Sequence, residues 1–177
     1  MNNNLIITIG REYGTGGREI GQKLALRLGI PFYDRELITR AAKKTGFDEK
    51  LFEQLDKRAT NSFLYSLTMF GSVGLNGMSL TDQLYLAQSN IIREMAEDSP
   101  CVIVGRCADH VLRDFPNKFD FFIHGSIEDR VKRVRTCGDY VIEGKTPEAA
   151  LEKMDKQRST YYNYYTGKVW GKCDHYD

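Results

Sequence analysis

The hydrophobic positions of this chain form short uninterrupted runs that are separated by longer stretches with helical spacing. The run at 5–9 does not alternate with polar residues, which is typical of a strand buried on both faces. Ile20, Leu24 and Leu28 then recur every four residues and predict a helix. The glycine-rich segment Gly10–Arg18 lies between them. This order predicts an anion-binding loop, because glycines let backbone amides converge on phosphate oxygens and the helix dipole favours negative charge.

Further strands and helices alternate along the rest of the chain. We expect strands at about 32–33, 101–104 and 119–124, and helices at about 34–45, 47–57 and 81–97, from 108, from 126 and from 146. The predicted helix caps are Asp34, Thr81-Asp82, Ser126 and Thr146. Residues 59–80 are irregular and are read as an insertion. The alternation predicts an α/β fold with a parallel sheet. We also expect that the fold has one more strand, which would follow Asp177 and is missing from this sequence.

The composition argues against several classes of function but does not assign one. A chain of 177 residues with 41% hydrophobic residues predicts one compact domain. A net charge of +1 gives no field that marks a nucleic-acid or membrane partner. The four cysteines have no metal-type spacing, which favours free thiols in a reducing compartment. With no signal segment or membrane-length apolar run, we expect a cytoplasmic protein.

The glycine-rich loop is close to a Walker A sequence but departs from it. The consensus G-x-x-x-x-G-K-[ST] places a lysine on the β- and γ-phosphates and a hydroxyl on magnesium. If Gly14 and Gly16 are the loop glycines, Gly17 takes the lysine position and Arg18 the hydroxyl position. No register supplies both groups. A glycine-rich turn without a ligand is the alternative interpretation.

Neighbouring side chains offer replacements for the missing lysine. Either Arg11 or Arg18 could deliver the positive charge, since a guanidinium binds phosphate bidentately. Thr15 is the remaining candidate for the magnesium hydroxyl.

Polar residues follow the other predicted strands as well. Ligands of open parallel sheets bind beyond the carboxyl ends of the strands, and Asp34, Arg106 and Asp109 fall at such ends. Asp34 is also a plausible helix cap, whereas an arginine directly after a buried strand needs an anionic partner. Arg130 and Arg133 form either a solvated helix face or a phosphate clamp.

The last predicted helix carries a further cluster of polar and aromatic residues. Arg158 follows Asp155 by three positions, so the two can pair on one face. The tyrosine-rich segment 161–165 is interpreted as core packing, as a lid over a ligand or as a stacking surface. The near-neutral net charge argues against a single-stranded nucleic-acid partner.

Taken in order, these motifs resemble the cytidylate kinase-like family of P-loop nucleoside monophosphate kinases. The segments that carry the resemblance are Ile7–Ile20, Pro31–Ile38, Val102–Asp109 and Tyr161–Gly171. The resemblance implies a three-layer P-loop NTPase fold, a parallel sheet flanked by helices. It implies one kinase-like domain with a core at 1–46 and 81–136, a helical monophosphate-binding insertion at about 47–80 and a lid at about 137–160.

The resemblance also implies an activity and site residues. It implies transfer of the γ-phosphate of ATP, with Mg²⁺, to CMP, dCMP or a similar small nucleotide. The implied ATP-binding residues are Arg11, Gly14, Thr15, Gly16, Gly17 and Arg18; the acceptor-binding residues are Asp34, Arg106 and Asp109; the catalytic arginines are Arg18, Arg130 and Arg158. The departure from the Walker sequence keeps two alternatives open, a nucleotide-binding sensor without turnover and a kinase for a small hydroxyl acceptor with Asp34 or Asp109 as its base.

Overall fold

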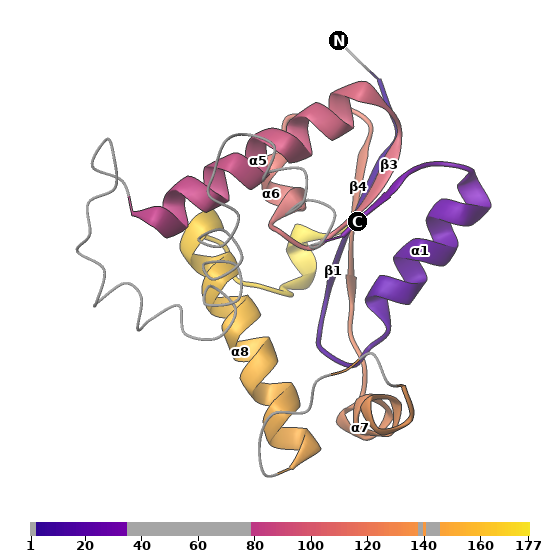
Figure 1. Ribbon diagram of the computed structural model, residues 1–177, viewed down its shortest axis with the longest axis vertical. Helices are drawn as coiled ribbons and strands as arrows, with labels where there is room; N and C mark the ends of the chain where they lie inside the picture. The colour runs from indigo at the N-terminus through magenta and orange to yellow at the C-terminus, as the bar shows by residue number, and fades with distance from the viewer. Residues whose placement is uncertain (1–2, 35–78, 138–139, 141–145) are drawn as a thin grey trace.

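The structure is a computed structural model that describes residues 3–34, 79–137, 140 and 146–177 (Figure 1). The strands are β1 (Ile6–Arg11), β2 (Phe32–Tyr33), β3 (Cys101–Val104) and β4 (Lys118–Ile123). The helices are α1 (Gly17–Leu28), α5 (Leu80–Asp98), α6 (Ala108–Val111), α7 (Ile127–Thr136) and α8 (Pro147–Thr166), followed by the 3₁₀ turn η1 (Cys173–His175).

The four described strands form one parallel sheet in the order β2-β3-β1-β4. Ile7 of β1 lies opposite Val102 of β3 on one side and Phe119 of β4 on the other. The prediction of an α/β fold with a parallel sheet is therefore confirmed. Because all strands run the same way, their carboxyl ends and the loops that follow them gather at one edge of the sheet.

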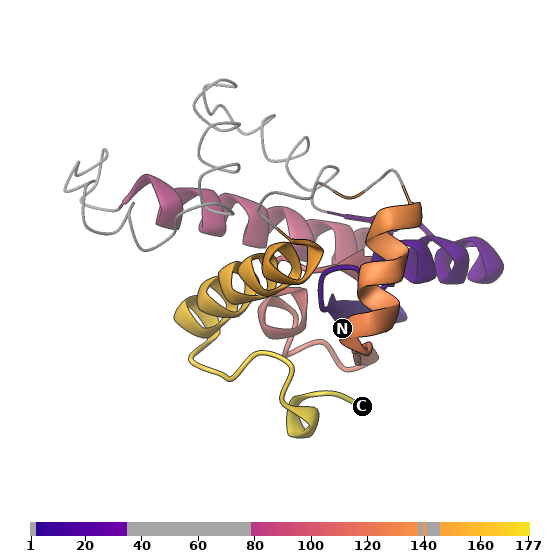
Figure 2. The same cartoon turned by 90° about the horizontal axis from the view of Figure 1, so that it is seen from below.

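Helices cover both faces of this sheet, which gives three layers (Figure 1). Alternate residues of β1 point to opposite faces: Ile7 and Ile9 pack against α1, whereas Ile6 packs with residues of α5 and α6. All four residues of β3 are buried, as the uninterrupted apolar run predicts. Helices α7 and α8 lie beyond the carboxyl ends of the strands (Figure 2).

Helix α1 contacts the sheet mainly through small residues, and from its apolar stripe Leu24 packs against the same core. Its buried residues are Gly17, Gly21 and Ala25, whereas Ile20 is 43% and Leu28 45% exposed. A Cβ at position 21 would lie 2.8 Å from Cγ2 of Val104 of β3. Small residues four positions apart thus let the helix backbone approach the sheet closely, and the four-residue spacing of larger residues indicates the helix but not its buried face.

The predicted helix starts are largely confirmed. Ser126 and Thr146 cap α7 and α8, and each accepts a hydrogen bond from a backbone amide three residues later. The cap predicted at Thr81-Asp82 is wrong by two residues, because Ser79 accepts the hydrogen bond from the amide of Asp82 and starts α5.

Several predictions fall on other parts of the chain. The helices expected at 34–45 and 47–57 and the segment 59–80 lie outside the described residues, apart from Asp34, Ser79 and the backbone of Leu80. At the other end, the amide of Asp177 donates to the carbonyl of Asp120 on the outer edge of β4, at 2.8 Å.

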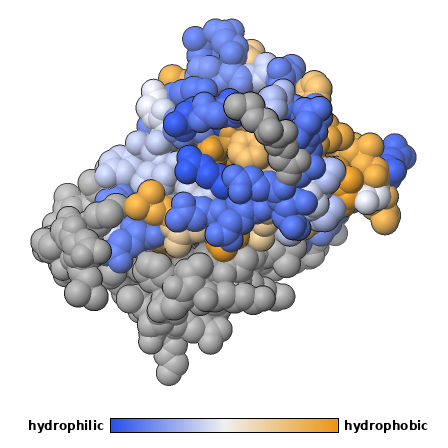
Figure 3. Space-filling model, turned by 90° about the horizontal axis from the view of Figure 1, so that it is seen from above, coloured by the Kyte–Doolittle hydropathy of each residue, from blue (hydrophilic) through white to orange (hydrophobic). Residues whose placement is uncertain are grey.

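Most of the surface seen in Figure 3 is hydrophilic, with separate patches of hydrophobic residues. Within the described ranges, every helix is too short or too polar to cross a membrane.

We predict that Gly21→Ala destabilises the protein although alanine favours helices. Overpacking of a tight core costs about 1–3 kcal/mol, which exceeds the gain of about 1 kcal/mol for alanine over glycine in a helix. We expect the free energy of unfolding, measured with denaturant, to fall by about 1 kcal/mol. The control Leu26→Ala, at a side chain that is 82% exposed on the same helix, changes it by less than about 0.5 kcal/mol. Equal stability of the two variants would contradict this account.

Candidate functional site

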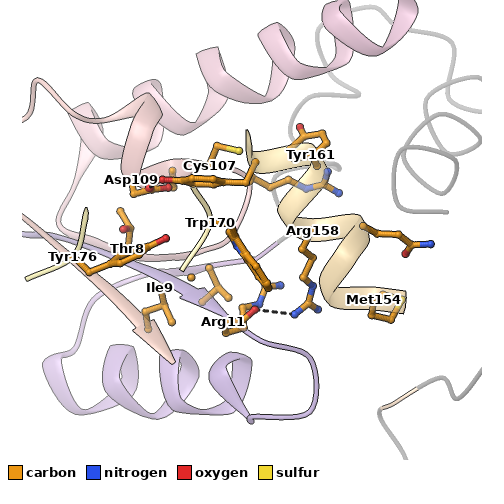
Figure 4. A pocket seen from close by; sticks show the side chains of 17 residues that line it. Thr8, Ile9, Arg11, Cys107, Asp109, Met154, Arg158, Tyr161, Trp170 and Tyr176 are labelled. Carbon is orange, nitrogen blue, oxygen red and sulfur yellow. Dashed lines mark hydrogen bonds between the residues drawn. The ribbon is translucent and has the colours of Figure 1, made fainter. Parts of the chain in front are cut away.

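A pocket opens at the carboxyl ends of β1 and β3 (Figure 4). The ends of these strands and the first residues of α6 form one wall. The opposite wall comes from Met154–Tyr162 of α8 and from Trp170 and Tyr176, which follow that helix. The site thus lies where parallel sheets bind ligands.

The glycine-rich loop connects β1 to α1 beside this pocket. Gly14 and Gly16 have φ values of 84° and 78°, a left-handed conformation that favours glycine. A Cβ at Gly14 would lie 3.0 Å from Leu151 and 3.1 Å from Val134, so the loop packs directly on α7 and α8. Gly16 precedes the first turn of α1, whose amides can bind an anion.

An ion pair between α7 and α8 holds the loop in place. Arg130 of α7 pairs with Asp155 of α8, and both also bind the backbone of Tyr13. The Tyr13 amide donates to Oδ1 of Asp155 at 2.7 Å, and Nε of Arg130 donates to the Tyr13 carbonyl at 2.8 Å. Glu12 lies 3.4 Å from Nη1 of Arg130. Arg130 is therefore held against the loop by its contacts with Tyr13, Glu12 and Asp155.

Two further side chains border the loop. The hydroxyl of Thr15 donates to the Glu12 carbonyl at 2.9 Å, which stabilises the turn. Arg133 of α7 lies against Gly16, where a Cβ would come within 2.7 Å of its Cζ. Arg133 also pairs with Glu19 of α1. Position 16 therefore excludes a side chain for two reasons, its left-handed backbone and the guanidinium beside it.

The turn after β3 is strained in a way that directs side chains into the pocket. Gly105, Arg106 and Cys107 have φ values of 79°, 60° and 54°, three left-handed residues in succession. Such a conformation costs about 1–3 kcal/mol at each non-glycine residue, and it occurs most often at functional sites. It places Arg106 and Asp109 in the wall of the pocket.

Tyrosines of α8 contact both of these side chains. The hydroxyl of Tyr162 donates to Oδ2 of Asp109 at 2.5 Å, and Arg106 hydrogen-bonds to Tyr161. Burial raises the pKa of Asp109, and the hydrogen bond from Tyr162 works in the opposite direction. The tyrosine-rich segment is thus partly a pocket wall.

Three arginines from three separate segments line the pocket: Arg11, Arg106 and Arg158. Nη1 of Arg158 donates to the Arg11 carbonyl at 3.0 Å (Figure 4). The guanidinium of Arg158 also lies over the ring of Tyr13, at 5.1 Å from its centroid. The side chain of Arg11 extends from the end of β1 toward Gly105.

The structure separates Arg18 and Asp34 from this cluster. Nε of Arg18 lies 2.7 Å from Oδ2 of Asp34, where the start of α1 meets the end of β2. Neither residue lines the pocket that contains Arg106 and Asp109. Of the acceptor residues expected together, the structure brings together only Arg106 and Asp109.

The sequence patterns did not predict every residue of the site. Trp170 and Tyr176 line the pocket from an irregular segment, where no periodicity fixes the path of the chain. The sequence of the glycine-rich loop gave no signal that Glu12 and Tyr13 contact Arg130. The resemblance segment 161–171 was the one signal that reached Trp170.

No group of three or more His, Cys, Asp and Glu in the described ranges is placed to hold a metal ion. The hydroxyl of Thr15, the candidate from the sequence, is engaged with the Glu12 carbonyl.

The site is thus built on a three-layer parallel α/β fold with a glycine-rich loop between the first strand and the first helix. Residues 6–177 match the model of the cytidylate kinase-like family, and the chain belongs to this family.

The solved structures that resemble the chain differ in sequence identity and in TM-score. An uncharacterized protein from Eubacterium ventriosum is 32% identical with a TM-score of 0.68, over 98% of this chain and 85% of that chain. A shikimate kinase from Bacteroides thetaiotaomicron is 16% identical with a TM-score of 0.49, over 90% and 82% of the two chains. A gluconokinase from Sinorhizobium meliloti is 16% identical with a TM-score of 0.47, over 89% of this chain and 76% of that chain. No curated protein matches the chain significantly.

We predict a pH-dependent effect of Asp109→Asn on stability. The pKa of an unfolded aspartate is near 3.9, and burial raises the pKa of Asp109 in the folded protein. Above the unfolded pKa the folded state therefore holds more protons, and the wild type loses stability as the pH rises through the folded pKa. Asparagine keeps the acceptor for Tyr162 but carries no charge.

The unfolding free energy of Asp109→Asn minus that of the wild type should therefore rise with pH from about 4 and then level off. Denaturant titrations at several pH values measure this difference. A difference that stays constant with pH would show that Asp109 ionises in the folded protein as it does in the unfolded chain.

Proposed function

We propose that this protein is a nucleoside monophosphate kinase that transfers the γ-phosphate of ATP to CMP, dCMP or a similar monophosphate. The proposal rests on membership of the cytidylate kinase-like family and on one observation of the site. That observation is the convergence of Arg11, Arg106 and Arg158 on a single pocket beside the glycine-rich loop.

The charge of the pocket suits a reaction between two phosphate groups. Among the described residues, its lining contains three guanidinium groups and one carboxyl, that of Asp109, whose pKa burial raises. Phosphoryl transfer depends mainly on positioning the reactants and on neutralising their charge. Arginines that reach one pocket from different segments reduce the repulsion between donor and acceptor phosphates.

The glycine-rich loop supports binding of the phosphate donor. The left-handed glycines and the amides of the first turn of α1 offer an anion seat, and side chains at positions 14 and 16 would displace the loop because they would collide with α7 and α8. ATP supplies the phosphoryl group, and Mg²⁺, when bound, supplies further charge neutralisation. Arg130 and Asp155 keep the loop in this conformation by binding the backbone of Tyr13.

The residues of the opposite wall support binding of the acceptor. We assign binding of the acceptor phosphate to Arg106 and orientation of the nucleotide to Asp109, because both line the pocket and Tyr162 holds the Asp109 carboxyl. Arg158 is positioned between this wall and the loop, where it can bind the transferring phosphate. Asp34 serves to hold Arg18 at the start of α1.

A second candidate function, phosphorylation of a small hydroxyl compound, is favoured by Asp109. A hydroxyl acceptor needs a base that takes its proton. The Asp109 carboxyl lies in the pocket wall, and its pKa is raised toward the range in which a carboxylate accepts protons well. The two functions differ in whether a nucleoside monophosphate or a hydroxyl compound stimulates turnover.

The first test measures ADP release from ATP and Mg²⁺ with a panel of nucleoside monophosphates and small polyols. Selective turnover with CMP or dCMP supports the proposed function, whereas turnover with a hydroxyl compound alone supports the second candidate. Nucleotide binding without turnover would support a non-catalytic sensor and contradict both.

We predict that Arg106→Ala raises the KM of the acceptor much more than the KM of ATP. Loss of a charged hydrogen bond costs about 1.5–3 kcal/mol, so the acceptor KM should rise about 10- to 100-fold. The matched control is Arg113→Ala, an exposed arginine that follows α6. An unchanged acceptor KM in Arg106→Ala would refute the role assigned to Arg106.

A further inference from the structure

The side chain of Arg11 occupies space that two glycines leave open. A Cβ at Gly17 would lie 2.7 Å from Cβ and 2.9 Å from Cγ of Arg11. A Cβ at Gly105 would overlap with Nη1 of the same arginine. The first glycine thus admits the stem of Arg11 and the second admits its guanidinium.

The stem of Arg11 cannot easily move away from position 17. Contacts below 3 Å with Cβ and Cγ involve the part of the side chain that is fixed by the backbone, so a substitution there requires the strand end to shift. The Arg11 carbonyl is held by Nη1 of Arg158 at 3.0 Å. A side chain at position 17 and the observed conformation of Arg11 therefore exclude one another.

Position 17 is also the Walker lysine position when Gly14 and Gly16 are the loop glycines. A lysine there would begin in the space that the Arg11 stem now fills. In the observed conformation, the chain can thus carry a cation at position 11 or at position 17, but not at both. An arginine at position 11 in place of a lysine at position 17 keeps a cation beside the loop, because the Arg11 side chain lines the pocket.

The other arginine considered for this role has a different place. Arg18 lies 2.7 Å from Asp34 and does not line the pocket, and its side chain is 52% exposed. Arg11 instead reaches from the end of β1 to the end of β3 and lines the same pocket as Arg106. Figure 4 shows it beside Arg158.

We propose that Arg11 replaces the Walker lysine: its guanidinium, seated over Gly105, binds the phosphate chain of the donor, and the glycine at position 17 is required to admit it. The identity of the anion as a nucleotide phosphate rests on the proposed function. A guanidinium binds phosphate through two parallel N–H donors, which fixes the phosphate more firmly than an ammonium point charge. Arg11 thereby becomes a binding residue of the loop although it precedes the glycines.

The test compares four variants with the wild type. Arg11→Met keeps an unbranched stem but removes the charge. Gly17→Lys introduces the Walker lysine against the existing arginine, and Arg11→Gly with Gly17→Lys completes the exchange in the opposite direction. Arg27→Ala, at an exposed position in the last turn of α1, is the control for the loss of a positive charge.

Binding is followed with ATP and, separately, with inorganic tripolyphosphate. Trp170 is the only tryptophan of the chain and lines the pocket, so its fluorescence reports binding there, and calorimetry checks the affinity. Thermal unfolding of the same proteins reports the steric conflict without any ligand.

We expect Arg11→Met to fold like the wild type and to bind tripolyphosphate about 10- to 100-fold more weakly. Gly17→Lys should unfold at a lower temperature and bind weakly. The double variant should recover thermal stability and bind at least about tenfold more tightly than Gly17→Lys alone, since side chains that share one space have coupled effects.

Three results would overturn the inference. The first is tripolyphosphate binding by Arg11→Met that equals that of the wild type. The second is a double variant that is no more stable and binds no more tightly than Gly17→Lys alone. The third is a wild type that binds neither ATP nor tripolyphosphate. Binding that depends on Arg11 but leads to no turnover with any monophosphate would support the inference and contradict the proposed kinase function instead.

Discussion

The ion pair between Arg130 and Asp155 is the contact on which the arrangement of the site depends. It joins α7 to α8, which follow β4 in the chain, and it binds the amide and the carbonyl of Tyr13 in the glycine-rich loop between β1 and α1. The side chains are only 9% and 17% exposed. Removing one partner of a buried pair costs about 3–5 kcal/mol, because the other charge stays buried without compensation. The loop conformation is thus coupled to the packing of both helices.

The arginines around the loop divide by the kind of group that they contact. Arg18, Arg130 and Arg133 pair with carboxylates and thereby tie helices and loop together. The contacts of Arg158 and Arg106 described above are with neutral groups, a carbonyl, an aromatic face and a hydroxyl. These contacts fix the direction of each guanidinium at the pocket wall.

Local sequence patterns predicted the frame of this protein well and its close contacts poorly. Uninterrupted runs such as 101–104 identify buried parallel strands, and Ser126 and Thr146 identify helix starts, because these signals depend on neighbours in the chain. The buried face of α1 was not evident, since Gly21 is selected by the proximity of Val104, more than eighty positions away. The pairing of Arg18 with Asp34 was likewise outside the reach of spacing arguments.

The glycine-rich loop shows most clearly why a sequence motif alone gives an incomplete account of a binding site. In the sequence, glycine at position 17 looks like the loss of a phosphate-binding lysine. In three dimensions the same glycine faces the stem of Arg11, and Gly105 faces its guanidinium. An arginine therefore needs small residues at two distant positions, one in the loop and one after β3. A cation beside the loop can therefore come from position 11 or from position 17, provided that the other of these two positions is a glycine.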